Sequence, residues 1–272
     1  MAFSRKSHTF VPEMSTVIYP SPIFGPVHSR RLGVSLGINL LPADGKICSF
    51  DCIYCECGLN AWHRPNLKMP TREQVQIALE ARLRLMAADG PKPDVLTFAG
   101  NGEPTLHPHF PEIIDDTIRL RNQDFPQARI SVLSNATQIL RPQVHAALLR
   151  VDNNILKLDT VDADFIQQID QPNGKYDVAA IVQGLKAFQG HVIIQTMFLS
   201  GTDAEGHDVT NTSDRFVQPW LDALREIAPQ QVMIYTIDRE TPVRSLQKAV
   251  PEVLDAIAER VRSLSLACSV AY

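Results

Sequence analysis

Three cysteines at close spacing form the densest group of reactive side chains in the sequence. Cys48, Cys52 and Cys55 lie in the stretch CSFDCIYCECG at 48–58, which also holds Cys57. Three thiolates on one short loop can bind three corners of an iron–sulfur cubane and leave one iron open, as in a reactive rather than a structural centre. Structural zinc is the alternative, but zinc sites usually draw two Cys or His pairs from separated segments, and no second pair is present. The spacing therefore favours an iron–sulfur cluster.

The bulk composition is typical of a globular protein, and a cytoplasmic location is the default expectation. Of the 272 residues, 44% are hydrophobic and 21% are charged, which allows a sizeable core. The N-terminus, MAFSRKSHTF, lacks the apolar stretch of a signal peptide, and no run of about 18 apolar residues predicts a membrane span. In a reducing compartment a tight cysteine cluster binds metal or does redox chemistry more often than it forms disulfides. The net charge of −4 gives nucleic acid no support as a partner beyond a local basic patch.

The chain alternates predicted strands with predicted helices. Short apolar runs predict strands at 33–40, 95–99, 130–134, 155–158, 192–199 and 232–237. Amphipathic stretches predict helices at 71–90, 111–122, 142–150, 177–189, 214–227 and 251–264. The first of these helices has a capping box of Thr71 and Gln74 and a C-terminal cap at Gly90, and the last has Pro251 in its first turn. Residues 1–32 are rich in proline and predict an irregular N-terminal arm.

This alternation indicates where a functional site lies. Strands and helices in alternation imply a parallel sheet with right-handed crossovers, either open or curled into a partial barrel. In both arrangements ligands bind at the carboxyl ends of the strands. The polar residues at those ends are Gly100, Asn101, Gly102, Glu103, Ser134, Asn135, Lys157, Asp159, Gln195, Tyr235 and Arg239.

These motifs resemble the radical SAM superfamily. Its signature is the spacing of Cys48, Cys52 and Cys55 with an aromatic residue, here Tyr54, before the third cysteine. GPVHSRRLGVSLGINLLP followed by CSFDCIYC is similar to the opening of a subfamily related to the wyosine-forming tRNA synthases. FAGNGEPTLHP resembles the glycine-rich element that follows the family's second strand, and LSNAT, LKLD and the DRETP region fall where its later strand ends should be. The resemblance covers most of the chain from about residue 24.

The resemblance implies a fold and a reaction. The fold would be α/β, a partial (β/α)6 barrel of the radical SAM type in a single domain over 1–272. The three cysteines would hold a [4Fe–4S] cluster whose open iron binds S-adenosylmethionine. Reductive cleavage would give a 5′-deoxyadenosyl radical that abstracts hydrogen from a substrate such as a nucleoside or another small molecule. A ferredoxin or flavodoxin would supply the electron.

The same resemblance assigns roles in binding S-adenosylmethionine. Residues 100–103 would hold the methionine amino group, although a plain turn ended by Pro104 is the structural alternative. Ser134 and Asn135 could bind the ribose or the methionine carboxylate, or could instead cap the next helix. Tyr54 would set its backbone or ring against the adenine.

Each of Lys157, Asp159 and Gln195 allows two interpretations. Lys157 and Asp159 alternate with leucines and point toward the interior, either to bind the cofactor or to form a buried structural ion pair. Gln195 interrupts an apolar strand and needs a polar partner, which a ligand or the core could supply. Tyr235 and Arg239 are candidate substrate contacts.

Several further residues have weaker signals. Arg30 and Arg31 could bind an anion or form an exposed basic pair. His107 and His109 lack a third metal ligand and are interpreted as loop residues. Cys57 could be a radical relay or a spare thiol, but a small residue near the cluster is the simplest interpretation.

Three functions fit the sequence. The first is a radical SAM enzyme with an unidentified substrate. Wyosine synthases carry further cysteines upstream of the triad, whereas no cysteine precedes Cys48 here. The second is an activase that abstracts hydrogen from a glycine of a partner protein. The third is a non-enzymatic iron–sulfur or zinc protein, which would need four protein ligands and would lose its metal when Cys57 is replaced.

Overall fold

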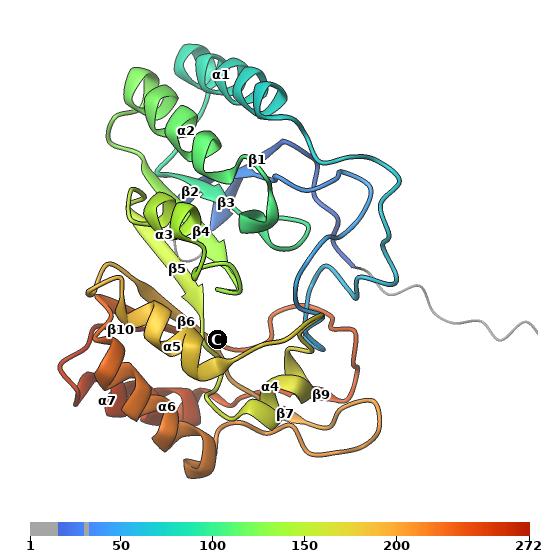
Figure 1. The fold of residues 1–272 in the computed structure, drawn as a ribbon, viewed down its shortest axis with the longest axis vertical. Coiled ribbons are helices and arrows are strands. Elements are labelled where there is room, and N and C mark those ends of the chain that lie inside the picture. The colour runs from blue at the N-terminus through green and yellow to red at the C-terminus, as the bar shows by residue number, and fades with distance from the viewer. Residues whose placement is uncertain (1–15, 30–32) are drawn as a thin grey trace, which may run out of the picture.

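A computed structural model describes residues 16–29 and 33–272 of the chain. Its main feature is an eight-stranded sheet with the order β1-β2-β3-β4-β5-β6-β8-β10 (Figure 1). The strands are β1 Ile23–Ser29, β2 Gly33–Ile38, β3 Val95–Phe98, β4 Arg129–Ser134, β5 Asn153–Lys157, β6 Ile193–Met197, β8 Gln231–Tyr235 and β10 Cys268–Ala271. A separate antiparallel pair joins β7, Leu199–Gly201, to β9, Leu246–Lys248.

The six strands predicted from the sequence are all present as parallel neighbours. β2, β3, β4, β5, β6 and β8 pair in that order, each parallel to the next. Their side chains are largely buried, and β3 is buried at every position, as expected for a parallel sheet covered on its faces. The α/β architecture and its mostly parallel sheet are therefore confirmed.

Helices cover the outer face of this sheet (Figure 1). They are α1 Arg72–Asp89, α2 Phe110–Asp124, α3 Pro142–Leu148, α5 Val178–Lys186, α6 Asp214–Ile227 and α7 Pro251–Arg262. The helix α4, Ala163–Ile169, lies beside β7 and β9 instead, and a short 3₁₀ helix η1, Pro104–Leu106, follows β3. At the start of α1, Thr71 and Gln74 form the predicted capping box, and Gly90 is the C-terminal cap. No helix in the described ranges combines the length and the apolar character that a membrane span requires.

Two segments differ from the prediction at the edges of the sheet. The irregular arm is wrong for residues 23–29, which form β1 antiparallel to β2. Proline is tolerated there because β1 is an edge strand, and the register shifts between Phe24 and Val27, next to Pro26. At the other edge, β10 adds a parallel strand beside β8. Arg30 and Arg31 lie outside the described residues.

The side chains on the inner face of the sheet change from apolar to polar along the strands. Leu133, Ile155, Ile193 and Met233 form one small buried cluster. Because side chains alternate along a strand, the inward-facing residues after them are Lys157, Gln195 and Tyr235. The change from apolar to polar occurs toward the carboxyl ends of the strands, where the cysteine loop lies.

Candidate cluster and cofactor site

The cysteine loop is attached to the carboxyl end of β3. Ile47 pairs with Gly102 in a parallel bridge. The Ile47 amide donates to the Asn101 carbonyl at 3.0 Å, and the Glu103 amide donates to the Ile47 carbonyl at 3.1 Å. The GNGEP segment, residues 100–104, therefore continues the sheet as a support for the loop.

Gly100 and Gly102 are required at this junction for a specific reason. Their φ angles are +134° and +124°, a backbone region that side chains disfavour. A Cβ on Gly102 would overlap the Ile47 carbonyl oxygen, and one on Gly100 would overlap the Asn39 side chain. The glycines thus allow close packing of GNGEP against the loop and β2. That residues 100–103 also hold the amino group of S-adenosylmethionine stays a prediction.

The side chain of Asn101 is engaged inside the protein. It accepts from the Tyr19 amide at 2.8 Å and donates to the Tyr19 carbonyl at 2.9 Å and the Pro42 carbonyl at 2.8 Å. Asn101 is fully buried and joins the N-terminal segment to the segment before the cysteine loop. Any contact of Asn101 with a ligand would have to come from its backbone.

Glu103 is a buried acceptor for the ends of two strands. Its carboxylate accepts from the Thr105 amide at 3.0 Å, the Thr105 hydroxyl at 2.5 Å, the Ser134 hydroxyl at 2.8 Å and the Asn135 amide at 2.6 Å. Burial raises the pKa of Glu103, although these donors oppose the rise. The predicted residues Glu103, Ser134 and Asn135 are therefore brought together. The capping alternative is wrong, because α3 begins at Pro142 with Arg141 as its N-cap.

Asn135 extends this network to the cysteine loop. Its side-chain amide lies 3.5 Å from the Cys48 sulfur and donates to the Ser49 hydroxyl at 2.9 Å. Its side-chain oxygen accepts from the Thr137 amide at 3.1 Å and the Thr137 hydroxyl at 2.8 Å. An amide donor aimed at a ligand sulfur is a contact that orients and tunes a metal ligand.

A second buried network surrounds Lys157. Its ammonium lies 2.5 Å from Asp159 and 3.2 Å from Asp170, and it contacts the Tyr54 hydroxyl. That hydroxyl also bonds to Asp159 and to Asp170 at 3.1 Å. Asp170 in turn lies 3.3 Å from the Cys52 sulfur. The predicted ion pair exists, and it is linked to the cysteine loop.

Charge explains why this network holds together. Burial by itself would lower the pKa of Lys157, but the carboxylates of Asp159 and Asp170 raise it well above its ordinary value. Burial raises the pKa of Asp170 to about 6. The remaining oxygen of Asp159 accepts from the Met197 amide at 2.9 Å. The Lys157 ammonium lies 4.6 Å from the centre of the Tyr54 ring, so it covers one face of that ring.

The three predicted ligands are presented together. Cys48, Cys52 and Cys55 pack on one apolar cluster that includes Phe50 and Ile53. Burial raises the pKa of Cys48 to about 12 and that of Cys52 well above its ordinary value. Hydrogen bonding from Cys57 and the nearby Lys46 ammonium lower the pKa of Cys55 to about 6 against the effect of burial.

Lys46 supplies positive charge beside the thiols, which sequence reasoning did not detect. Its ammonium is buried, donates to the Gly58 carbonyl at 2.6 Å and lies 3.4 Å from Asp51. Burial would lower the pKa of Lys46, but the thiols of Cys55 and Cys48, among other acidic groups, raise it. A buried cation beside three thiols suits a cluster bound by thiolates. Among the described residues, no three His, Cys, Asp or Glu side chains are arranged to hold one metal ion.

A cavity of about 280 Å³ adjoins the loop at the carboxyl ends of β6, β8 and β10. Its walls include Tyr54, Cys55, Gln195, Tyr235 and Arg239. The predicted cofactor and substrate contacts on these strands therefore line one space. Arg239 and Glu56 both line this cavity, and the Arg239 guanidinium lies 3.1 Å from the Glu56 carboxylate. The same guanidinium lies 3.2 Å from the Tyr19 hydroxyl.

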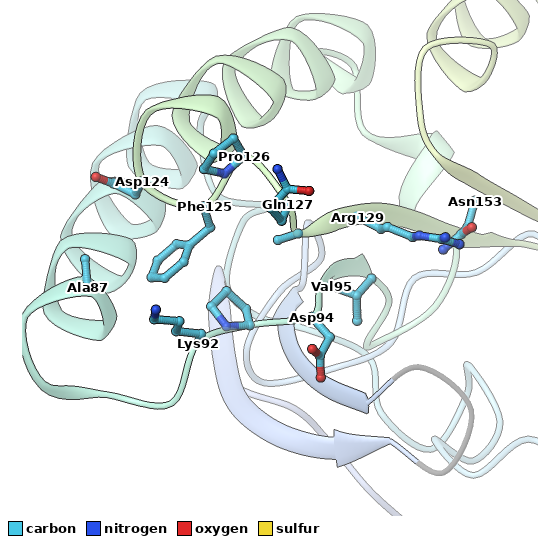
Figure 2. A pocket seen from close by; sticks show the side chains of 12 residues that line it. Ala87, Lys92, Asp94, Val95, Asp124, Phe125, Pro126, Gln127, Arg129 and Asn153 are labelled. Atoms are coloured by element: carbon cyan, nitrogen blue, oxygen red, sulfur yellow. The ribbon is translucent and has the colours of Figure 1, made fainter.

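A larger cavity of about 730 Å³ lies at the opposite end of the sheet (Figure 2). Its walls include Lys92, Asp94, Phe125, Arg129 and Asn153, at the amino ends of β3, β4 and β5. None of the predicted site residues lines it. In parallel α/β sheets ligands bind at the carboxyl ends, and the predicted residues gather there.

His107 and Cys57 have defined surroundings. His107 ends η1, is buried, and bonds to the Pro70 carbonyl at 2.8 Å. His109 is exposed at the start of α2.

The buried Cys57 thiol lies 3.4 Å from the Gly100 carbonyl oxygen. This placement fits the interpretation of Cys57 as a small residue beside the cluster site.

Comparisons with known proteins agree with this geometry. Residues 44–210 match the family model described as Radical SAM superfamily. A UPF0026 protein of Helicobacter pylori is 30% identical over 236 residues, which cover 85% of this chain and 71% of the relative. A UPF0026 protein of Methanocaldococcus jannaschii is 30% identical over 241 residues, 86% of this chain and 69% of the relative.

Solved structures share the fold. A radical SAM methyltransferase from Sphaerobacter thermophilus superposes with a TM-score of 0.61 at 15% identity, over 87% of this chain and 65% of that one. Streptococcus suis SuiB bound to S-adenosylmethionine superposes with a TM-score of 0.60 at 14% identity, over 85% of this chain and 50% of that one. The likeness at these identities extends to the architecture of the sheet and its helices.

Proposed function

This chain belongs to the radical SAM superfamily, and within it to the UPF0026 proteins, and on that premise we propose that it cleaves S-adenosylmethionine reductively and uses the resulting radical to abstract hydrogen from a substrate. The superfamily consists of enzymes that use a [4Fe–4S] cluster and S-adenosylmethionine. The non-enzymatic alternative is thereby set aside. The substrate that we propose is a nucleoside or another small molecule.

The proposed cluster ligands are Cys48, Cys52 and Cys55. When bound, the cluster supplies one electron and an open iron for the methionyl end of S-adenosylmethionine. The chain supplies three thiolates, a buried ammonium at Lys46 that offsets their charge, and an Asn135 amide 3.5 Å from the Cys48 sulfur. Donors and cations near ligand sulfurs stabilise their ionised form.

The cavity beside Cys55 is the proposed cofactor pocket. Its volume of about 280 Å³ is close to the lower end of small-molecule pockets, roughly 300 Å³. We assign Gln195 and Tyr235 to its walls as cofactor or substrate contacts. GNGE, residues 100–103, and Ser134 with Asn135 do not line this cavity. They are proposed to meet the methionyl end of the cofactor from the other side of the cysteine loop, where Glu103 bonds to Ser134 and Asn135.

Lys157, Asp159 and Tyr54 have a positioning role in this proposal. Their mutual bonds fix the Tyr54 side chain one residue before Cys55. The hydroxyl of Tyr54 is held by this network, so the ring edge or backbone is the part that can meet an adenine. A buried polar network with its members mutually bonded is rigid, and rigidity keeps a reactive site in one geometry.

One observation carries the proposal most directly: Tyr54 and Cys55 line the same cavity as the carboxyl ends of β6, β8 and β10. A cluster on the triad would therefore face the space in which a cofactor can lie. The test is to reconstitute the protein anaerobically, reduce it with dithionite, add S-adenosylmethionine and measure 5′-deoxyadenosine and methionine by chromatography. We expect both products from the wild type and neither from Cys55→Ala. Reduced protein with a full cluster that never yields 5′-deoxyadenosine under any substrate condition would contradict the proposal.

The relationship to wyosine-forming enzymes and the activase alternative both stay predictions. The same product assay separates them when it is run with tRNA or with a candidate glycyl-radical partner. A substrate is identified when its addition raises the yield of 5′-deoxyadenosine above the unstimulated level.

A further inference from the structure

Arg239 is the positively charged side chain among the described residues that line the cofactor pocket. It already binds a carboxylate of the chain itself, because its guanidinium lies 3.1 Å from Glu56 across the pocket wall. The side chains of Arg239 and Glu56 are 51% and 42% exposed. Side chains that line a pocket and also reach solvent lie at its entrance. A molecule that enters the pocket on this side therefore meets the ion pair first.

The guanidinium of Arg239 has unused hydrogen-bond donors. Its Nη1 donates to the Glu56 carboxylate at 3.1 Å and to the Tyr19 hydroxyl at 3.2 Å. A guanidinium can also donate from Nε and Nη2, and neither does so within the described part of the chain. Carboxylates and phosphates often bind two nitrogens of an arginine side by side, whereas Glu56 binds one. Exposed ion pairs contribute little to stability, so an anion that uses both nitrogens can replace Glu56.

Tyr19 supports Arg239 from the side opposite this exchange. The Tyr19 amide donates to the Asn101 side chain at 2.8 Å, and the Tyr19 carbonyl accepts from that side chain at 2.9 Å. The centre of the Tyr19 ring lies 4.7 Å from that of Phe24. Burial raises the pKa of Tyr19, although Arg239 opposes the rise, so the hydroxyl is neutral at pH 7 and does not compete as an anion. Arg239 thus has a fixed neutral partner and an exchangeable charged one.

The acidic residues near Arg239 stay negatively charged and restrict what can bind. Glu56 has to turn toward solvent when another anion takes its place. Asp238 also lines the pocket and lies 4.0 Å from the Lys248 ammonium, which offsets part of its charge. Glu240 is exposed and lies outside the pocket wall. Direct contact with the guanidinium is therefore what favours an anion here, and not a positive field over the whole pocket.

The carboxylate of the cofactor is assigned to another place. In the proposed function the methionyl end of S-adenosylmethionine meets the open iron and residues 100–103, which do not line the pocket. An anion at Arg239 therefore belongs to a different molecule. Glu56 directly follows Cys55, so an anion in its place lies beside the cysteine loop. The rest of that molecule can then reach Gln195 and Tyr235 in the same pocket.

We propose that Arg239 recognises a carboxylate or phosphate group of the substrate, and that Glu56 occupies this position until the substrate enters. The inference rests on the proposed function, because it assumes that the substrate meets a radical formed at this pocket. It narrows the substrate to a nucleotide or another small molecule with an anionic group. No covalent bond is made or broken in the exchange, since one anion replaces another at the guanidinium.

The test uses two variants that break the same ion pair. The reconstituted protein is titrated with inorganic phosphate, acetate or methylammonium at constant ionic strength, and dissociation constants are measured by isothermal titration calorimetry. Arg239→Gln removes the guanidinium, and Glu56→Gln removes the competing carboxylate. The matched controls are Lys186→Gln and Glu226→Gln, which break an exposed ion pair of 3.2 Å on α5 and α6.

We expect the two variants to change anion binding in opposite directions. Arg239→Gln should weaken the binding of phosphate or acetate about tenfold or more, because the charged hydrogen bonds of the guanidinium are lost. Glu56→Gln should strengthen it about two- to fivefold, because an exposed competing ion pair is removed. The tighter of the two anions indicates whether the substrate group is a phosphate or a carboxylate. The controls, and the addition of S-adenosylmethionine to the wild type, should leave the dissociation constants unchanged.

Three results would overturn the proposal. One is that neither anion binds, or that both variants change binding in the same direction, as expected of a purely structural ion pair. Another is competition between S-adenosylmethionine and phosphate, which would assign Arg239 to the cofactor. The third is binding of methylammonium that is lost in Glu56→Gln and gained in Arg239→Gln, which would indicate a cationic substrate. Failure of the proposed function is distinguishable, because it shows as reduced protein that never yields 5′-deoxyadenosine, whereas anion binding is measured without that reaction.

Discussion

The two ends of the sheet each contain a cavity, and they differ in where their charges lie. At the carboxyl ends, Lys46, Glu103, Asp159 and Asp170 are buried and held by partners. At the amino ends, the cavity is larger, but Lys92, Asp94 and Arg129 around it are exposed and Asp124 is partly exposed.

This difference shows that cavity size is a poor guide to the site here. A buried charge costs free energy unless it is paired and hydrogen-bonded, and groups of such charges are typical of functional sites. The amino-end cavity has the ordinary exposed charges of a protein surface. The carboxyl-end networks also join residues far apart in sequence, such as Cys52 and Asp170, which fixes the cysteine loop to the barrel.

The largest expected effect is the loss of the cluster. Alanine at Cys48, Cys52 or Cys55 removes a ligand of the proposed cluster. Replacing a residue that only hydrogen-bonds to a metal ligand typically lowers metal affinity roughly 10- to 100-fold, so the loss of a ligand should lower the affinity for iron by more than that. The measurement is iron and acid-labile sulfide per chain after anaerobic reconstitution. Cys57→Ala is the control and should keep its cluster. Equal loss in Cys57→Ala would indicate four protein ligands and a closed site.

Lys157→Met should cause the next largest effect, on stability. It leaves Asp159 and Asp170 buried without their cation, and breaking a buried pair costs about 3–5 kcal/mol. The free energy of unfolding is measured with urea. Lys186→Met, at an exposed pair with Glu226 3.2 Å away, should cost about 1 kcal/mol or less. Similar losses in both variants would contradict the distinction between buried networks and surface charges.

Gly102→Ala should destabilise the junction between GNGEP and the cysteine loop. A disfavoured backbone conformation costs about 1–3 kcal/mol, and overlap with the Ile47 carbonyl adds to this. Cluster content should fall together with stability. Gly206→Ala is the matched control, because its φ is +87° but no atom lies within 4 Å of the added Cβ. If the two substitutions behaved alike, close packing at Gly102 would not matter.

The smallest expected effect is a pH dependence at His107. Burial lowers its pKa below the ordinary 6.5, so below that pH the unfolded chain takes up a proton more readily than the folded one. Stability should therefore be fully present at neutral pH and decrease as pH falls through about 6.5. His107→Gln should reduce this decrease in urea titrations at about pH 7.5 and 5.5. His109→Gln should change the decrease less than His107→Gln does, because His109 only adds to the lowering of the His107 pKa.

The sequence predicted the parallel sheet well, and the predicted site residues lie at the carboxyl ends of its strands. Strands such as 95–99 and 130–134 were recognisable because buried parallel strands are continuous apolar runs. Their carboxyl ends must share one edge, so Glu103, Ser134 and Asn135 could be expected together. The cysteine spacing gave the chemistry, and membership of the superfamily agrees with it.

Other features could not be read from local pattern. β1 was missed because Pro22 and Pro26 resemble a loop, yet an edge strand tolerates them. Asp170 follows the seven-residue α4, which is too short to show helical periodicity, and its contact with Cys52 spans 118 positions. Nothing in the local sequence marks Lys46 as buried, and only the packing of Gly58 and Asp51 around it shows a buried cation.

Electron paramagnetic resonance tests the central claim most directly. The protein is reconstituted anaerobically with iron and sulfide and reduced, and its spectrum is recorded with and without S-adenosylmethionine. We predict a [4Fe–4S]⁺ signal that shifts when S-adenosylmethionine is added, because the triad leaves one iron open to it. A signal that is unchanged by S-adenosylmethionine, or a protein that binds no iron, would contradict the account.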